Sequence, residues 1–396
     1  MTDAPVIRSD VPGSFPWAVF HERHPKLVRQ LLDALPYGPA ERAGIERLLA
    51  ESTTGVLEPL PEHAHDHAQW LEWGRGLWGR PWGEAPFLWA ESYFYRRLLE
   101  ATGYFRPGTW QGIDPFAPFK NAELAGPAVD EELAALSALD ALPGPRRSAA
   151  LLSSALWGNR ADLSFQLTAG RPTAPSDLVA DDSALLWSAL EHTPGGRVCL
   201  VADNAARELL PDLVLIDHLL HTGLASQVVL YVKPQPYYVS DATTADTLAA
   251  LERLRTAPTD AAATIGRRLW QAMTDDTLAV RTHPFFCAPL PFRDLPTDLR
   301  TELTGATMTI LKGDLNYRRL VDDRLHPPTT PFPETVTHFP SPVATLRTLK
   351  SDVLVGIGAT TLTRLDSSGR TWRTDGRHAL IQCRPTAAPA RGNPAK

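Results

Sequence analysis

Three short polar segments of the chain share one layout, in which an apolar run precedes them and a helical pattern follows. Parallel strands deliver the residues that follow them to one edge of a sheet, and ligands bind in the crevice outside the carboxyl ends of those strands. We therefore expect the three segments to meet at one site. The segments are Asp203-Asn204, Ser240-Asp241 and Lys312–Arg318, and the apolar runs cover residues 198–201, 228–232 and 308–311.

The side chains of Asp203, Asn204 and Asp241 form a candidate metal-binding and catalytic set. Carboxylate and amide oxygens are hard ligands that suit Mg²⁺ or Mn²⁺, and Mg²⁺ usually takes one or two carboxylates together with waters and substrate phosphates. Each residue also has a structural alternative, because Asp, Asn and Ser cap the starts of helices. The expected shared edge favours the metal interpretation.

The segment Lys312–Arg318 is a candidate binding site for a phosphate ester. Gly313 allows close approach of the backbone to an anion, and Lys312 supplies positive charge. Asp314 and Asn316 offer hydrogen bonds to sugar hydroxyls, and Arg318 offers bidentate contacts to phosphate. The spacing of a Walker A loop is absent. A polar loop without a ligand is the alternative.

The elements that must position these residues fall into two parts. Up to residue 145 the pattern is helical, with helices expected at Pro25–Asp33, Pro86–Glu100 and Glu131–Leu142. We expect a tryptophan-rich stretch between the first two to pack in a core or domain interface rather than to bind a ligand. The helix-breaking sequence Pro143-Gly144-Pro145 marks the candidate boundary between the two domains. The predicted division is 1–145 helical, 146–384 α/β and 385–396 a flexible tail.

The part after residue 145 alternates short β-branched runs with helical patterns, which is typical of βαβ units and a parallel sheet. The strands are expected near 197–202, 227–232, 307–311 and 352–356. The helix after Asn204 carries apolar residues at helical spacing from Leu209 to Leu220. Pro211 lies inside it, so we expect a kink or a late start of that helix.

Composition narrows the class of protein further. The 396 residues are 43% apolar and 21% charged, with a net charge of −6. The sequence therefore lacks the excess of positive charge that is typical of a nucleic-acid-binding protein. No apolar run is long enough for a membrane span. Cys199, Cys287 and Cys383 are few and far apart, so we expect reduced thiols. The first residues lack the pattern of a secretory signal, and a cytoplasmic location is expected.

Two other motifs give weaker signals. His63, His65 and His67 lack the spacing of a binuclear zinc signature, and a solvated turn is the favoured interpretation. Gly356-Ile357-Gly358 lacks the third glycine of a dinucleotide-binding loop.

Five strings occur along the chain in this order: 156–164 (LWGNRADLS), 203–205 (DNA), 239–241 (VSD), 312–318 (KGDLNYR) and 347–350 (RTLK). Together they resemble the metal-dependent damage-control phosphatases, and within them the sugar-phosphate phosphatase branch that is also named acidic residue methyltransferase. Two further strings in the helical part, at 22–25 and 91–97, resemble the same branch, so the resemblance spans roughly residues 14 to 356.

The resemblance implies a three-layer α/β/α Rossmann-like domain with a mainly parallel sheet behind an all-helical N-terminal domain. It implies a divalent metal ion (Mn²⁺, Co²⁺, Ni²⁺ or Mg²⁺) held by the residues at 203, 204 and 241, and hydrolysis of a small-molecule phosphate ester such as fructose 1-phosphate. The implied ester contacts are Asp314, Leu315, Asn316, Tyr317, Arg318 and Lys350, and Asn159 and Asp162 either shape the site or cap a helix.

Alternatives remain open at this point. Residues 205–207 and 233–236 depart from the eukaryotic members, which affects the preferred sugar more than the reaction. An aspartate that attacks phosphorus and an aspartate that orders the metal and a water are both compatible with the sequence. A sugar-phosphate sensor without turnover is a second function, and transfer of a methyl group to protein carboxylates is a third. The loop Ala202–Ala205 has no glycine for the cofactor of a methyltransferase. The sequence leaves the oligomeric state open.

Overall fold

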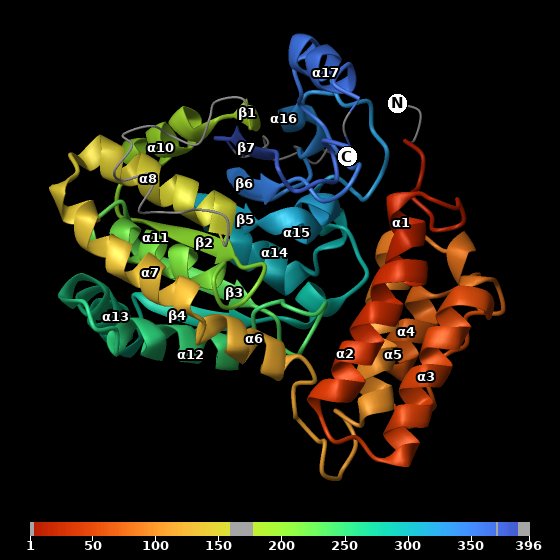
Figure 1. Ribbon diagram of the computed structural model, residues 1–396. Coiled ribbons are helices and arrows are strands. Elements are labelled where there is room, and N and C mark those ends of the chain that lie inside the picture. Colours follow the sequence, from red (N-terminus) through yellow and green to blue (C-terminus); the bar gives the residue numbers. More distant parts are fainter. Residues whose placement is uncertain (1–3, 159–176, 370, 387–396) are drawn as a thin grey trace, which may run out of the picture.

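The computed structural model describes residues 4–158, 177–369 and 371–386. A bundle of helices at the N-terminus stands beside a sheet that is covered on both faces by helices (Figure 1). The elements of the bundle are α1 (Phe15–Ala18), the π-helix η1 (Val19–Arg23), α2 (His24–Ala34), α3 (Pro39–Thr54), α4 (His67–Trp73), η2 (Trp82–Glu84) and α5 (Phe87–Thr102).

The remaining helices pack on the sheet. Those on one face are α6 (Ala117–Leu124), α7 (Pro127–Ala135), η3 (Leu136–Ala141), α8 (Gly144–Trp157), α10 (Ser183–His192), α11 (Leu209–His221), α12 (Thr244–Arg255) and α13 (Asp260–Thr274). Those that follow β4 are η5 (Pro284–Cys287), η6 (Phe292–Asp294), α14 (Thr297–Thr304), α15 (Gly313–Leu320), α16 (Phe332–Thr335) and α17 (Ala359–Asp366).

The sheet has seven strands in the order β1-β7-β6-β5-β2-β3-β4. All neighbouring pairs are parallel except β6 and β7, so β1 and β7 run against the other five. The predicted α/β/α class with a mainly parallel sheet is confirmed. The strands are β1 (Leu178–Asp181), β2 (Gly196–Val201), β3 (Ala225–Val232), β4 (Leu278–Thr282), β5 (Met308–Lys312), β6 (Val343–Thr348) and β7 (Ala379–Arg384).

The strand order creates a switch point between β2 and β5. From β2 the chain moves outward to β3 and β4, and it then returns to pair β5 on the other side of β2. In open α/β sheets, ligands bind in the crevice at such a point, because the connections leave the two carboxyl ends in opposite directions. Asp203 follows β2 and Gly313 follows β5, so both lie at this crevice.

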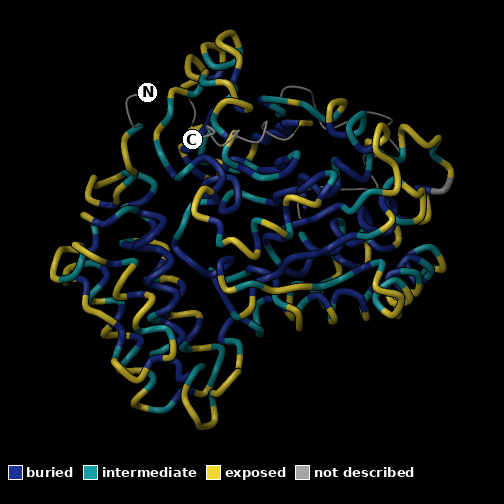
Figure 2. The backbone as a smooth tube through the Cα atoms, turned by 180° about the vertical axis from the view of Figure 1, so that it is seen from behind, coloured by how far each residue is buried: buried dark blue, intermediate teal, exposed yellow. Residues whose placement is uncertain are grey.

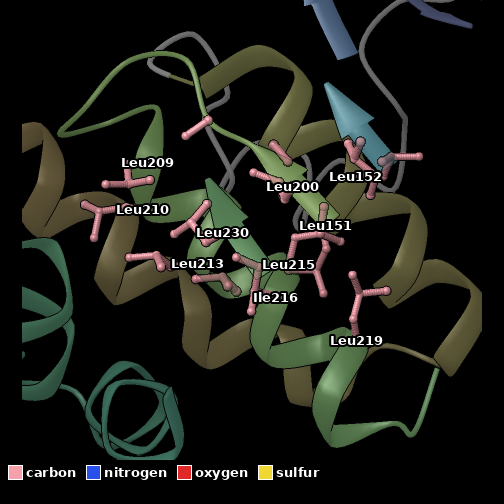
Figure 3. Packing of buried hydrophobic residues seen from close by; sticks show 14 of the residues in the cluster. Leu151, Leu152, Leu200, Leu209, Leu210, Leu213, Leu215, Ile216, Leu219 and Leu230 are labelled. Atoms are coloured by element: carbon pink, nitrogen blue, oxygen red, sulfur yellow. The ribbon is translucent and has the colours of Figure 1, made fainter. Parts of the chain in front are cut away.

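Alternate residues of the central strands enter two different cores. In β2, Val198 and Leu200 face the core with α8 and α11, whereas Cys199 and Val201 face the core on the opposite side. Burial on both faces explains why these strands are continuous apolar runs. Figure 3 shows Leu200 and Leu230 packed against leucines of α11 and α8. Figure 2 shows the sheet as mostly buried backbone, and exposed residues gather mainly on the outer turns and helices.

The structure corrects several predicted elements. The segment 352–356 is not a strand, and its apolar residues Val353 and Val355 pack as an extended loop in the second core. The strands β1, β4, β6 and β7 lie outside the predicted ranges. The predicted helix Glu131–Leu142 is divided between α7 and η3. The late start of α11 is confirmed: it begins at Leu209, which leaves Pro211 in the first turn, where proline is tolerated.

The core of the helical bundle and the cores of the sheet draw on different parts of the chain, and the division at residue 145 stays a prediction. Phe116 is the last buried residue of the bundle core, and Trp70 and Trp82 lie inside it as expected for packing residues. From Val129 onward most of the buried hydrophobic residues belong to the two cores of the sheet. None of the helices in the described part of the chain is long and apolar enough to cross a membrane.

Candidate metal centre

The loops after β2 and β3 are joined by main-chain hydrogen bonds. Asn204 and Asp241 form an antiparallel bridge, Ala205 N–H donates to Ser240 O at 2.7 Å, and Ala242 N–H donates to Asp203 O at 2.8 Å. These bonds fix the separation of the two loops without help from any side chain. As a result the side chains of 203, 204 and 241 converge at the switch point, as the sequence predicted.

Convergence buries two like charges together. Asp203 is 8% exposed and Asp241 is 3% exposed. Burial, and then the neighbouring Asp241 carboxylate, raise the pKa of Asp203 well above its ordinary value. Burial also raises the pKa of Asp241 to about 6, although Lys233 acts to lower it. Two adjacent buried carboxylates are unfavourable unless a cation compensates them.

The donor set fits a hard divalent cation. Asp241 Oδ2 is buried and has no hydrogen-bond partner among the described residues. Ser240 Oγ donates to Asn204 Oδ1 at 2.6 Å, which orients the amide oxygen. Within the described ranges, no group of three or more His, Cys, Asp or Glu forms a metal-binding cluster. Asp203, Asn204 and Asp241 instead offer two carboxylates and one amide oxygen, which leaves coordination positions of the ion for water or phosphate.

Gly313 leaves room for the Asp203 carboxylate. Its φ is +83°, and a Cβ at this position would lie 1.8 Å from Asp203 Oδ2. The close approach of the backbone to an anion was expected here, but in the structure that anion is the side chain of Asp203. Gly313 begins α15, whose first free N–H groups face negative charge favourably.

Asn316 and Lys312 stabilise the crevice through buried hydrogen bonds and a buried ion pair. Asn316 Nδ2 donates to Ala202 O at 3.1 Å and to Lys312 O at 2.8 Å, which ties the ends of β2 and β5 together. The Lys312 ammonium is buried, donates to Ala155 O and pairs with Asp212 at 2.5 Å. The expected contact of this ammonium with phosphate is therefore corrected to a structural ion pair.

Asp314 holds the loop that carries Lys350. Its carboxylate accepts hydrogen bonds from Arg347 Nε at 2.8 Å, Ser351 Oγ at 3.1 Å and Lys350 N–H at 3.3 Å. Burial acts to raise the pKa of Asp314, but Arg347 and Arg318 hold it below its ordinary value. We assign Asp314 to positioning Lys350 rather than to the predicted sugar contact.

Lys350 is the predicted ester-binding residue whose charged group is most open to a ligand. Its side chain is 46% exposed, and its Nζ lies 3.8 Å from Glu208 Oε1. Burial acts to lower the pKa of Lys350, but the carboxylates of Glu208 and Asp203 raise it overall. A protonated ammonium thus lies near the carboxylates of Glu208 and Asp203, and its partial exposure leaves it open to a phosphate.

Arg318, Leu315 and Tyr317 are buried against the protein. Arg318 pairs with Asp323 at 2.7 Å and with Glu91 of α5 at 3.1 Å, so it joins the bundle to the sheet domain. Leu315 packs with Leu88 across the same boundary. The hydroxyl of Tyr317 accepts a hydrogen bond from Val355 N–H at 3.1 Å. The predicted direct ester contacts of these three residues are replaced by packing and pairing roles.

Two predicted residues of the site stay untested, and two residues beside the site were not predicted. Asn159 and Asp162 lie outside the described residues, so their roles stay predictions. Sequence reasoning missed Glu208, whose carboxylate raises the pKa of Asp203. It also missed Lys233, whose Nζ lies 3.3 Å from Asp241 Oδ2. Lys233 directly follows β3, and Asp203 closely follows β2. The expectation that residues after parallel strands meet at one edge of the sheet therefore identifies Lys233 as well.

Comparisons with known proteins identify the family of the chain. A family profile described as "Damage-control phosphatase ARMT1-like domain" matches residues 19–363. Proteins named "Damage-control phosphatase ARMT1" are similar to the chain over most of its length. The one from Danio rerio is 30% identical over 93% of this chain and 94% of its own. The one from Mus musculus is 30% identical over 93% and 96%, and the one from Homo sapiens 28% over the same shares.

A solved structure shares the fold. A DUF89 family protein from Pyrococcus horikoshii aligns with a TM-score of 0.50 at 15% sequence identity, over 93% of this chain and 98% of its own. At this level of identity the likeness concerns the fold alone.

The substitution Gly313→Ala tests the close contact with Asp203. We expect it to weaken Mn²⁺ binding by more than about tenfold, because the new methyl group displaces a metal-ligand candidate, whereas strain from the left-handed backbone alone costs only about 1–2 kcal/mol of stability. Isothermal titration calorimetry with Mn²⁺ measures the first effect, and thermal unfolding measures the second. Gly223→Ala is the matched control, because Gly223 has φ +74° and no atom within 4 Å of an added Cβ. Equal Mn²⁺ affinities in both variants would contradict the assignment.

The paired carboxylates predict a pH dependence of stability in the metal-free protein. Because the pKa of Asp241 is raised to about 6, the folded state binds more protons than the unfolded state between about pH 4 and 6. The free energy of unfolding therefore falls as pH rises through this window. Asp241→Asn removes this loss, so the stability of the variant relative to the unaltered protein should rise between acid and neutral pH, by on the order of 1 kcal/mol or more. Urea unfolding in the presence of a chelator measures the difference, and a difference independent of pH would refute the raised pKa.

Proposed function

Because the chain belongs to the ARMT1-like damage-control phosphatase family, we propose that it is a phosphatase that depends on a divalent metal ion and hydrolyses small sugar phosphates. Fructose 1-phosphate is representative of the substrate class. The family identity supports phosphatase activity in metabolite repair. The observation that carries the finer proposal is the shared burial of the Asp203 and Asp241 carboxylates at the switch point of the sheet.

Each residue of the site has a role in the proposed reaction. Asp203, Asn204 and Asp241 would hold the ion, which when bound polarises a phosphoryl oxygen and neutralises the charge that develops in the transition state. Lys350 contributes an exposed ammonium for the non-bridging oxygens of the same phosphoryl group. Asp314 keeps Lys350 in place through its backbone N–H. Preorganised charges of this kind need little rearrangement during the reaction.

The loop that leads to Asp241 is anchored on the helical bundle. Tyr237 and Tyr238, in the loop that leads to Asp241, pack on α5: Tyr237 donates to Ser92 Oγ at 2.6 Å, and Tyr238 stacks on Tyr95 at 4.8 Å between ring centroids. Tyr238 has φ +39°, a strained backbone for a residue other than glycine. These contacts fix the loop that carries the proposed metal ligand Asp241 against the neighbouring domain.

We further propose a cytoplasmic location. The three cysteines of the chain are free and buried, which suits a reducing compartment.

Replacement of either metal-ligand aspartate tests the function directly. We expect Asp203→Asn and Asp241→Asn to lower kcat on fructose 1-phosphate with Mn²⁺ by more than about a thousandfold, because removal of a charged ligand costs several kcal/mol of transition-state stabilisation. The assay is release of inorganic phosphate with Mn²⁺, Co²⁺, Ni²⁺ or Mg²⁺, and circular dichroism checks the fold of both variants.

The same assay separates the rival functions. Full activity in both variants would contradict the assignment of the metal site. Binding of sugar phosphates without release of phosphate by the unaltered protein would instead indicate a sensor. A thermal shift with S-adenosylmethionine, in the absence of phosphatase activity, would support the methyltransferase.

A further inference from the structure

Lys233 is a buried lysine at the candidate metal centre. It directly follows β3, its backbone N–H donates to Ala242 O at 2.8 Å, and its side chain is 2% exposed. The ammonium faces Asp241 Oδ2 at 3.3 Å and lies 5.6 Å from the centroid of the Tyr237 ring. Neither the ammonium nor Asp241 Oδ2 has a partner with hydrogen-bond geometry among the described residues.

Each of the other two buried lysines of the described chain has two close partners. Lys120 lies 2.6 Å from Asp114 and 2.6 Å from Asp246, and Lys312 is bound by Asp212 and the carbonyl of Ala155. An ammonium has three donors and no acceptor, and removing it from water is costly unless well-placed anions compensate it. By this standard Lys233 is incompletely satisfied, although it is as deeply buried as the other two.

A metal ion on Asp241 would change the environment of Lys233. The ion draws on the same carboxylate that compensates the ammonium, and it places a second positive charge near it. Like charges a few ångströms apart in a poorly solvated site repel each other strongly. An oxyanion that binds beside the ion removes this conflict, because its oxygens accept the free N–H groups of Lys233.

Resting on the proposed function, we propose that Lys233 binds the phosphoryl group from the buried side of the site, opposite the exposed Lys350, and thereby couples metal binding to phosphate binding. The ammonium opposes the ion when the ion binds alone and favours the pair of ion and phosphate. The two ligands should therefore bind cooperatively, each increasing the affinity of the other by the same factor. A residue that only orients Asp241 would instead strengthen metal binding with or without phosphate.

Calorimetric titration of the full-length metal-free protein with Mn²⁺, with and without saturating inorganic phosphate, measures the coupling. In the unaltered protein we expect phosphate to tighten Mn²⁺ binding by about tenfold, within the usual range of coupling between sites. In Lys233→Met, Mn²⁺ alone should bind at least as tightly as in the unaltered protein, and the effect of phosphate should fall below about twofold.

Lys120→Met is the matched control. It removes another buried cation that lowers the pKa of Asp241, but one that is paired with two carboxylates of its own. We expect the coupling to persist in this variant. Weaker binding of Mn²⁺ alone in Lys233→Met, with the phosphate effect retained, would overturn the proposal and assign Lys233 to orienting Asp241.

A crystal structure of the unaltered protein with Mn²⁺ and phosphate gives a second measurement that does not depend on the folding of a variant. Lys233 Nζ within hydrogen-bond distance of a phosphate oxygen supports the proposal, and an Nζ that contacts only Asp241 overturns it. Both measurements use binding alone, so they are independent of turnover. A protein that shows the coupling but releases no phosphate from sugar phosphates would contradict the proposed function and leave the role of Lys233 intact.

Discussion

The mutual burial of the Asp203 and Asp241 carboxylates is the constraint on which the site depends. Main-chain hydrogen bonds between the loops after β2 and β3 set their positions, so the side chains cannot separate without breaking the connection. Two buried negative charges then require a cation, and their raised pKa values express the same cost. The shared burial of these carboxylates supports the proposed ion at the switch point of the sheet.

Much of the polar sequence around the site stabilises this arrangement. In the segment Lys312–Arg318, Lys312 forms a buried ion pair and Asn316 joins the ends of β2 and β5. Asp314 holds the loop of Lys350, and Arg318 forms an ion pair with the bundle. A single altered residue in this segment therefore changes the site indirectly. Among the described residues around the two aspartates, the side chains that remain available to bind a ligand come from separate parts of the chain.

The sequence was sufficient to predict the fold class and the meeting of Asp203, Asn204 and Asp241, because both follow from strand direction. It was insufficient for Lys312, Asp314 and Arg318, since a charged side chain after a strand can turn to the ligand or to the interior. Only the partners decide, and those partners, such as Asp212 and Arg347, lie far away in the chain. The strand expected at 352–356 was wrong for a related reason: consecutive apolar residues buried in a loop that pairs with no strand have the same sequence pattern as a buried strand.

The central claim is that Asp203, Asn204 and Asp241 together hold one divalent ion. Anomalous diffraction at the manganese edge, from crystals of the unaltered protein soaked in Mn²⁺, tests it most directly. The account predicts one strong peak at the carboxyl ends of β2 and β3, within coordinating distance of an oxygen from each of the three side chains. A peak bound elsewhere, or bound without both aspartates, would contradict the account.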